Sequence, residues 1–246
     1  MVKWIWTAFI VALTVTGGFA RENCHQQWNS YLDRHEIPSS YHSLIGFCDQ
    51  DLKDKIRDLI VENLPLSYND ARRHMFESLD NQEGVVCAVY SEKCIETWTI
   101  PNHRVMNCEH SWPQSKGAVG VAKSDLHHLF PVMARNNSRR GNRPFCEVEV
   151  VRWSEEGSKS GDSRHGTSCF EPPDRHKGDL ARAMLYFSIR YSKEIDLEQE
   201  EFFRLWSQSD QVSPQENERN DEIESIQDNR NPFVDLAFLV HLIDDF

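Results

Sequence analysis

Apolar residues recur at helical spacing in several parts of the chain. Residues 49–63 carry one such stripe, formed by Leu52, Ile56, Leu59 and Ile60, which predicts an amphipathic helix. Residues 178–191 carry a second, formed by Leu180, Met184, Phe187 and Tyr191. Two more helices are predicted over 197–208 and 213–226, and the last of these opens with Ser213 and Pro214, a common helix start.

Short runs of β-branched and aromatic residues predict a small set of strands over residues 84–108. Residues 124–130 form a mixed extended run that stops at Pro131. Proline is tolerated in the first turn of a helix, so we expect a helix to begin there, continue to Arg139 and end at Gly141-Asn142. The Ser-, Gly- and charge-rich residues 154–168 are predicted to be a surface loop. The fold class expected is α+β, with a small antiparallel sheet and many helices.

The N-terminus has the pattern of a secretory signal peptide. A lysine at position 3 is followed by an apolar run and a small-residue ending at Gly18-Phe19-Ala20, so residues 1–20 are predicted to be removed on export. The alternative is an uncleaved anchor, but the run is short of the roughly 20 residues that span a bilayer. No Gly/Ser/Pro linker divides the remainder, and residues 21–246 are therefore predicted to form one domain.

All seven cysteines lie after this segment, where an exported protein meets oxidising conditions. Cys87 and Cys94 flank a short segment that suits a local disulfide, and Cys24 with Cys48 could tie down the N-terminal region. An odd number leaves at least one thiol outside an internal disulfide. A zinc ion held by cysteines is disfavoured because the chain has no C-x2-C pair.

The formal net charge of −12 argues at first against a polyanionic partner. The charge is unevenly distributed, however. Residues 194–224 are strongly acidic, which is typical of a solvated helical surface, whereas residues 116–143 contain one acid, Asp125, among six cations. These cations are Lys116, Lys123, Arg135, Arg139, Arg140 and Arg143. The basic segment is therefore a candidate for phosphate binding.

Residues 107–142 also hold the groups that phosphodiester hydrolysis needs, namely a base for water and oxygen ligands for a hard cation. Glu109 and Asn137 can supply a carboxylate and an amide oxygen to Mg²⁺. His110 can serve as the base, because a neutral imidazole is available near physiological pH. Neighbours on an extended strand point to opposite faces, so the strand must bend or end at Glu109-His110 if both face one phosphate.

Three motifs occur in a fixed order: Glu109-His110-Ser111-Trp112-Pro113, Asp125-Leu126-His127-His128-Leu129-x-Pro131, and Asn137-x-x-Arg140-x-Asn142. In this order they resemble the endonuclease I family of periplasmic and extracellular nucleases, which belongs to the ββα-metal, or His-Me finger, group. The resemblance spans roughly residues 80–236, and it implies a finger core over about residues 95–142.

The resemblance implies that Glu109 and Asn137 bind one Mg²⁺, which Mn²⁺ or Ca²⁺ could replace, and that His110 is the general base. Asn136 is the alternative to Asn137. Arg140 is predicted to be a catalytic residue. It either contacts phosphate or locks the helix end by pairing with a carboxylate. Two residues are expected to support the site through hydrogen bonds, Asp125 and His127. The remaining cations are expected to bind nucleic acid: Lys116, Lys123, Arg135, Arg139 and Arg143.

The sequence therefore predicts an exported, Mg²⁺-dependent endonuclease that cleaves DNA, RNA or both with little sequence preference and leaves 5′-phosphate ends. No membrane association is expected after removal of the signal peptide. Two alternatives belong to other classes. A zinc-dependent hydrolase would use His110 with His127 or His128, and a nucleic-acid-binding module would keep the fold without catalysis.

Overall fold

The structure is a computed structural model that describes residues 23–246, so the predicted signal peptide lies outside the described residues. The described chain divides into two compact units, one of residues 23–57 with 241–245 and one of residues 58–240 with Phe246. The prediction of a single domain over residues 21–246 stays a prediction. In the described part, no helix is both long enough and apolar enough to cross a membrane.

The first unit contains a helix over residues 23–32, the 3-10 helix η1 (Ser39–Leu44) and most of α2 (Asp49–Ile60). The predicted disulfide between Cys24 and Cys48 is present. The buried Trp28 donates a hydrogen bond from Nε1 to the Phe47 carbonyl oxygen at 2.8 Å. Helix α2 confirms the amphipathic helix predicted over 49–63, although Leu59 of the expected apolar stripe is 38% exposed.

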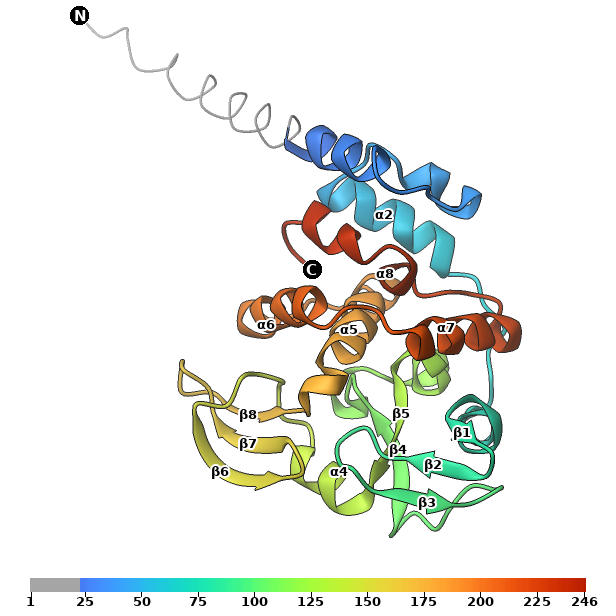
Figure 1. Ribbon diagram of the computed structural model, residues 1–246, viewed down its shortest axis with the longest axis vertical. Helices are drawn as coiled ribbons and strands as arrows, with labels where there is room; N and C mark the ends of the chain where they lie inside the picture. Colours follow the sequence, from blue (N-terminus) through green and yellow to red (C-terminus); the bar gives the residue numbers. More distant parts are fainter. Residues whose placement is uncertain (1–22) are drawn as a thin grey trace, which may run out of the picture. The chain divides into compact units, whose positions relative to one another are not determined.

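The second unit begins with α3 (Tyr68–His74), the π-helical turn η2 (Met75–Leu79) and a three-stranded antiparallel sheet. Its strands are β1 (Asn81–Gln82), β2 (Val85–Cys87) and β3 (Cys94–Glu96) (Figure 1). They confirm that residues 84–108 form short strands. Cys87 lies directly opposite Cys94 in the register, and the two form the predicted local disulfide.

A ββα finger follows. Strands β4 (Met106–His110) and β5 (Leu129–Met133) pair antiparallel, and α4 (Ala134–Arg140) comes directly after β5. The helix start predicted at Pro131 is wrong, because Pro131 lies inside β5 opposite Cys108. Its fixed φ suits an extended edge strand, and its carbonyl accepts a hydrogen bond from the Val89 N–H at 2.9 Å. The predicted helix end is confirmed, since Gly141 caps α4 with a φ of 59°.

A second three-stranded antiparallel sheet consists of β6 (Val150–Glu155), β7 (Ser158–Asp162) and β8 (Ser168–Glu171). The surface loop predicted over 154–168 is therefore wrong. The buried positions of β7 are Ser158, Ser160 and Gly161, so the strand lacks the apolar alternation by which strands are recognised. Glu156 and Gly157, with φ values of 48° and 89°, form the two-residue turn that joins β6 to β7.

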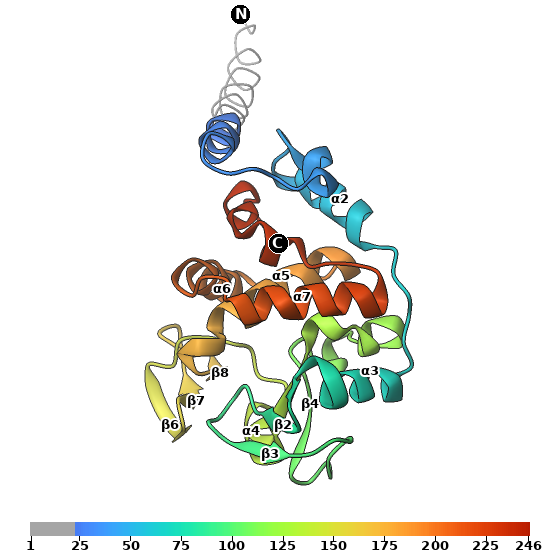
Figure 2. The same ribbon diagram turned by 45° about the vertical axis from the view of Figure 1, so that its right-hand side comes forward.

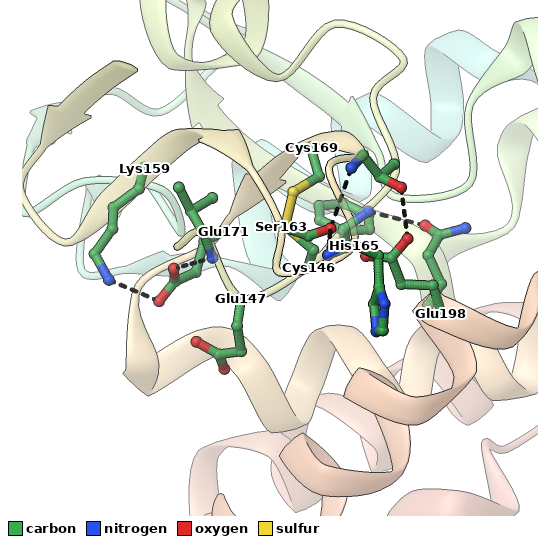
Figure 3. Close-up of a disulfide and its surroundings, with 12 residues drawn as sticks. Cys146, Glu147, Lys159, Ser163, His165, Cys169, Glu171 and Glu198 are labelled. Carbon is green, nitrogen blue, oxygen red and sulfur yellow. Dashed lines mark hydrogen bonds and ion pairs between the residues drawn. A yellow bond between two sulfur atoms is a disulfide. The ribbon is translucent and has the colours of Figure 1, made fainter. Parts of the chain in front are cut away.

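The third disulfide, between Cys146 and Cys169, ties the segment before this sheet to β8 (Figure 3). At the end of β8, Glu171 accepts hydrogen bonds from Lys159 Nζ at 2.9 Å and from the Val148 N–H at 2.8 Å. The seventh cysteine, Cys108, is free and buried. One unpaired thiol is what the odd number of cysteines predicted.

The remaining helices form a layer over the strands (Figures 1 and 2). They are α5 (Lys177–Tyr191), α6 (Leu197–Ser209), α7 (Pro214–Gln227) and the short α8 (Pro232–Asp235), with the 3-10 turn η6 (Asp174–His176) before α5. The 3-10 helix η7 (Ala237–Leu242) follows α8 in the chain. Helices α5, α6 and α7 confirm the three helices predicted for this half of the chain. Helix α5 is buried along almost its whole length, which makes it the centre of the layer. The α+β class is confirmed.

Candidate active site

Glu109 and His110 are the last two residues of β4, and both side chains are buried, with exposed fractions of 2% and 7%. Because they are neighbours on an extended strand, their side chains diverge. Glu109 contacts α4, whereas His110 contacts the loop between β4 and β5. The strand ends immediately afterwards, and the Ser111 N–H donates to the His128 carbonyl oxygen at 3.0 Å. The expected strand end at this pair is therefore present.

The Glu109 carboxylate is held from one side. Arg140 Nη1 lies 3.2 Å from Oε1, and the Tyr90 hydroxyl donates to the same oxygen at 3.2 Å. These contacts leave Oε2 as the oxygen that could face a cation. Burial raises the pKa of Glu109 to about 6, and the nearby Arg140 charge and the Tyr90 hydrogen bond limit that rise.

Arg140 fastens the end of β4 to α4. Its Nη1 donates to the His110 carbonyl oxygen at 3.2 Å, its Nη2 donates to the Ser111 carbonyl oxygen at 2.6 Å, and its guanidinium lies 4.4 Å from the centroid of the Phe145 ring. Only 2% of Arg140 is exposed. Of the two roles predicted for this residue, the observed geometry is that of the carboxylate pair.

His110 is held in one tautomer. Its Nε2 lies 3.0 Å from the Lys123 carbonyl oxygen, and since a carbonyl can only accept, Nε2 carries the hydrogen. The lone pair is then on Nδ1, whose hydrogen-bond contact within residues 23–246 is a long one, 3.4 Å from Gln114 Nε2. Burial, followed by the neighbouring His128, lowers the pKa of His110 to about 3. The imidazole is neutral at pH 7 and can accept a proton from water.

The carbonyl groups that fix this site come from the 3-10 helix η4 (Gly120–Ser124), which lies between β4 and β5. A short helix leaves its last carbonyls without intrahelical partners, so they can accept from side chains. The Lys123 carbonyl binds His110, and the Ala122 carbonyl accepts from His128 Nε2 at 2.7 Å. The ring of His128 lies 5.6 Å from that of His110.

His127 and His128 lie on the 3-10 helix η5 (Leu126–His128) rather than in an extended run. His128 is the one beside His110, whereas His127 faces away, with Nε2 3.1 Å from the Asn229 carbonyl oxygen. The supporting role predicted for His127 stays a prediction. Asp125 accepts hydrogen bonds from the hydroxyls of Tyr191 at 2.7 Å and Tyr186 at 3.0 Å, so it joins the finger to α5.

Asn137 lies on α4 and is half-buried. Its Nδ2 donates to Asn107 Oδ1 at 2.7 Å and approaches the Cys108 carbonyl oxygen at 3.5 Å. Because these contacts use the amide nitrogen, the amide oxygen Oδ1 is not engaged by them. The alternative residue, Asn136, is 1% exposed and donates to the Tyr90 carbonyl oxygen at 3.2 Å. That burial places Asn136 in the core.

The available donors fit a hard cation better than zinc. Over residues 23–246, no group of three or more His, Cys, Asp or Glu side chains is placed to hold a metal ion. Glu109 and Asn137 instead offer one carboxylate and one amide oxygen, a set that suits an ion which keeps several waters. Assignment of these two residues as ligands stays a prediction.

The cations predicted to bind nucleic acid differ in their surroundings. Arg135 lies 3.5 Å from a Glu155 carboxylate oxygen, and Arg139 lies over the Trp153 ring at 5.5 Å. Arg143 donates to the Arg139 carbonyl at the end of α4. Lys116 and Arg143 also line a cavity of about 250 Å³ beside Trp112 and Arg140. The Lys123 carbonyl contacts His110 Nε2, and the positive charge of the Lys123 side chain is near enough to contribute to the lowered pKa of His110.

Sequence reasoning missed three residues of the site: Tyr68, Tyr90 and His128. Tyr68 and Tyr90 lie outside the motifs, in α3 and in the turn after β2, and no local pattern marks either of them. His128 does lie within a motif, but the alternation expected of an extended run does not apply to a 3-10 helix.

An antiparallel strand pair that ends in Glu109-His110 and is followed by a helix bearing Asn137 is the ββα arrangement of the His-Me finger nucleases. The chain belongs to the endonuclease I family, whose model matches residues 48–237. It is therefore a nuclease, a phosphodiester hydrolase. Nucleases of this family are in general metal-dependent.

Several relatives are similar to the chain. The extracellular ribonuclease of Bacillus subtilis (strain 168) is 29% identical over 79% of this chain and 74% of its own length. The extracellular ribonuclease of Bacillus amyloliquefaciens is 29% identical over 75% and 70%. An extracellular deoxyribonuclease of Aeromonas hydrophila is 28% identical over 46% of this chain and 48% of its own length. These relatives, together with the three disulfides, confirm that the protein is exported.

Proposed function

We propose that this protein is a Mg²⁺-dependent endonuclease that hydrolyses phosphodiester bonds of DNA, RNA or both, with little sequence specificity, and leaves 5′-phosphate ends. The observation that carries the proposal is the pair at the end of β4. His110 is neutral and fixed with Nδ1 as its proton acceptor, and its neighbour Glu109 is held by Arg140 and Tyr90. A base and an oxygen ligand therefore occupy fixed positions on one rigid element.

In this mechanism His110 Nδ1 takes a proton from a water molecule, and the water oxygen forms a bond to phosphorus. The bond from phosphorus to the 3′-oxygen breaks, and the departing oxygen takes a proton from solvent. The phosphate stays on the 5′-oxygen of the downstream fragment, and the upstream fragment ends in a 3′-hydroxyl. The Lys123 carbonyl stabilises the imidazolium that forms, because the Nε2 hydrogen it accepts becomes more acidic as Nδ1 gains a proton.

Glu109 and Asn137 would hold the cation, and Arg140 would keep the Glu109 carboxylate in place. When bound, Mg²⁺ would neutralise charge that develops on the phosphate oxygens. Because both ligands are oxygens, Mn²⁺ and Ca²⁺ are the ions most able to substitute.

We propose that the substrate contacts are mainly to phosphates, because the cations of the basic segment are lysine and arginine side chains. Binding should weaken steeply with salt. We propose RNA as the first substrate to test. The relatives that align over about three quarters of this chain are named ribonucleases, whereas the deoxyribonuclease aligns over 46%.

The test is digestion of a supercoiled plasmid and of a structured RNA by the mature chain, first in EDTA and then with Mg²⁺, Mn²⁺, Ca²⁺ or Zn²⁺ added. We expect cleavage with Mg²⁺, none in EDTA, and loss of cleavage in His110→Ala. The matched control is His103→Ala, which changes an exposed histidine shortly before β4. Product ends should accept a 5′ label only after phosphatase treatment.

Unchanged cleavage by His110→Ala would contradict the assignment of the base. Activity with Zn²⁺ alone that is lost in His128→Ala would favour the zinc hydrolase. Tight nucleic-acid binding with no cleavage under any metal would favour the binding module. Far-UV circular dichroism of each variant separates loss of activity from loss of fold.

A further inference from the structure

The ring of Tyr68, the first residue of α3, lies next to the imidazole ring of His110. The two ring centroids are 5.4 Å apart with an interplanar angle of 36°. Tyr68 also neighbours the buried thiol of Cys108, which precedes Glu109 on β4. Helix α3 therefore contributes to the surroundings of the base, although it lies outside the finger and outside all the sequence motifs.

Two cations lie at the Tyr68 ring. The ammonium group of Lys123 is 4.5 Å from the ring centroid, and the guanidinium group of Arg72 is 5.8 Å from it. Among the described residues, neither Lys123 nor Arg72 forms an ion pair with a carboxylate. The next residue of the same helix behaves differently, because Arg73 pairs with Asp70 at 2.7 Å. Within residues 23–246, these two cations therefore contact an aromatic ring and pair with no carboxylate.

Two like charges at one ring repel each other, and an anion that contacts both would relieve that repulsion. A cation–π contact at a partly exposed site contributes only about 0.5–1 kcal/mol, less than a charge-assisted hydrogen bond to phosphate. Lys123 also fixes the location of such an anion. Its carbonyl oxygen binds His110 Nε2 at 3.0 Å, so its ammonium group belongs to the same residue that orients the base.

We propose that Lys123, Arg72 and the Tyr68 ring form a phosphate-binding subsite, the α3 subsite, which holds a phosphodiester of the substrate strand adjacent to the one that is cleaved. The ligand is the pair of non-bridging oxygens of a nucleic-acid phosphate. The proposal rests on the proposed nuclease function. Lys123 was predicted to bind nucleic acid from the basic segment, whereas Arg72 and Tyr68 are assigned by the structure.

The test is equilibrium binding of a fluorescent RNA oligonucleotide to the full mature chain carrying His110→Ala, measured by anisotropy at several salt concentrations in EDTA. Lys123→Met and Arg72→Met are each expected to weaken binding several-fold and to reduce the slope of log K against log salt by roughly 0.7, the value of one lost phosphate contact on a single strand. Arg73→Met is the matched control, since that cation is already paired. Its slope should equal that of the parent.

The ring is tested separately. Tyr68→Phe keeps the aromatic face and should bind as the parent does, whereas Tyr68→Leu should weaken binding as Lys123→Met does. Lys123→Arg should restore both affinity and slope, because it keeps the charge and the backbone carbonyl. That rescue excludes a purely structural effect.

Parent-like slopes in both Lys123→Met and Arg72→Met would overturn the α3 subsite, and so would an equal loss in Arg73→Met. Failure of the nuclease proposal is read from a different experiment, the cleavage assay with His110→Ala. A failed subsite therefore appears as unchanged binding with His110-dependent cleavage, and a failed nuclease assignment appears as cleavage that does not depend on His110.

Discussion

Two arginines of the second unit have almost fully buried side chains, and each pairs with a glutamate, yet the two pairs are built differently. Arg182 of α5 contacts both oxygens of Glu216 on α7, with Nε to Oε1 at 2.6 Å and Nη2 to Oε2 at 2.5 Å. Arg140 of α4 contacts one oxygen of Glu109, at 3.2 Å. The first pair is bidentate and the second is not.

The difference separates scaffold from site. The Arg182 guanidinium is fully engaged, with further contacts to the Asp210 carbonyl at 2.8 Å and to Asp179 at 3.3 Å, so it serves to join α5 to α7. Arg140 is buried to a similar degree but its Nε has no hydrogen-bond partner among the described residues. An incompletely satisfied buried charge is costly, and proteins tend to keep such groups at functional sites. Because Arg140 and Tyr90 contact Oε1 of Glu109, Oε2 is the oxygen that would face the proposed cation.

The largest expected effect comes from Glu109→Gln. The amide keeps the shape of the side chain but removes the charge that would hold a divalent cation. We expect the Mg²⁺-dependent cleavage rate to fall by ~10³-fold, or ~4 kcal/mol in transition-state free energy. The measurement is initial cleavage rate of RNA at saturating Mg²⁺, together with thermal unfolding to show that the fold is intact.

The matched variant is Glu216→Gln, which alters the carboxylate of the Arg182–Glu216 pair, called the scaffold pair below. Its cleavage rate should stay within a few-fold of wild type. A rate loss in Glu216→Gln as large as that in Glu109→Gln would remove the distinction between the two pairs.

The scaffold pair should instead dominate stability. Arg182→Met leaves the buried Glu216 carboxyl group and the partly exposed Asp179 carboxylate without their guanidinium partner, and breaking a buried pair in this way costs about 3–5 kcal/mol. The measurement is urea unfolding with the disulfides intact. Arg164→Met is the control, because Arg164 and its partner Glu201 are about half exposed and such pairs contribute at most ~1 kcal/mol. Equal midpoints for the two variants would contradict this prediction.

The contrast between scaffold and site also shows what could be predicted from the sequence. Helix α5 follows from apolar periodicity, since the residues that recur at helical spacing are the ones that pack. Helix α7 was instead marked by its Ser213-Pro214 start. The pair Glu109-His110 drew its meaning from ordered motifs. Strand β7 was missed because its buried residues are serine and glycine, which give no apolar alternation. Gly161 is required there by the close approach of the neighbouring strand. A Cβ on Gly161 would lie 2.0 Å from the Val150 carbonyl oxygen.

Long-range contacts account for the rest. The Tyr90 hydroxyl contacts Glu109, which lies 19 residues further along the chain, and β1, β2 and β3 lie between Tyr68 and His110 in the sequence. Neither contact therefore has a local pattern. Pro131 was misplaced for a related reason. A proline is compatible with the first turn of a helix and with an edge strand, and the choice between them depended on the pairing partner β4.

A smaller effect is expected in the pH dependence of stability. Burial and then the Asp179 carboxylate raise the pKa of Glu216 to about 8, from an ordinary value of 4.5. The folded state therefore binds this proton more tightly than the unfolded state. Its contribution to stability is full below about pH 4.5 and is lost as pH rises through 8. The free energy of unfolding of wild type, taken relative to Glu216→Gln, should fall by on the order of 1–3 kcal/mol between pH 5 and 8.

The control for this pH dependence is Glu218→Gln, which changes an exposed carboxylate on the same helix. Relative to wild type it should show no trend with pH. If the free energy of unfolding of wild type relative to Glu216→Gln rises with pH, the Arg182 charge affects the pKa of Glu216 more than burial does. The pair would then resemble an ordinary surface ion pair in its pH dependence.

The smallest effect tests whether the scaffold pair depends on the local structure of α7. Ser213 caps this helix, and its Oγ accepts a hydrogen bond from the backbone N–H of Glu216 at 3.1 Å. Ser213→Ala removes the cap and should lower the free energy of unfolding by about 1 kcal/mol. Ser225→Ala, which removes an exposed hydroxyl near the other end of α7, should change it by less than ~0.5 kcal/mol. Cleavage by Ser213→Ala should equal that of wild type, because the cap supports Arg182 and Glu216 rather than Glu109. A large loss of cleavage without a matching loss of stability would show that α7 acts on the finger itself.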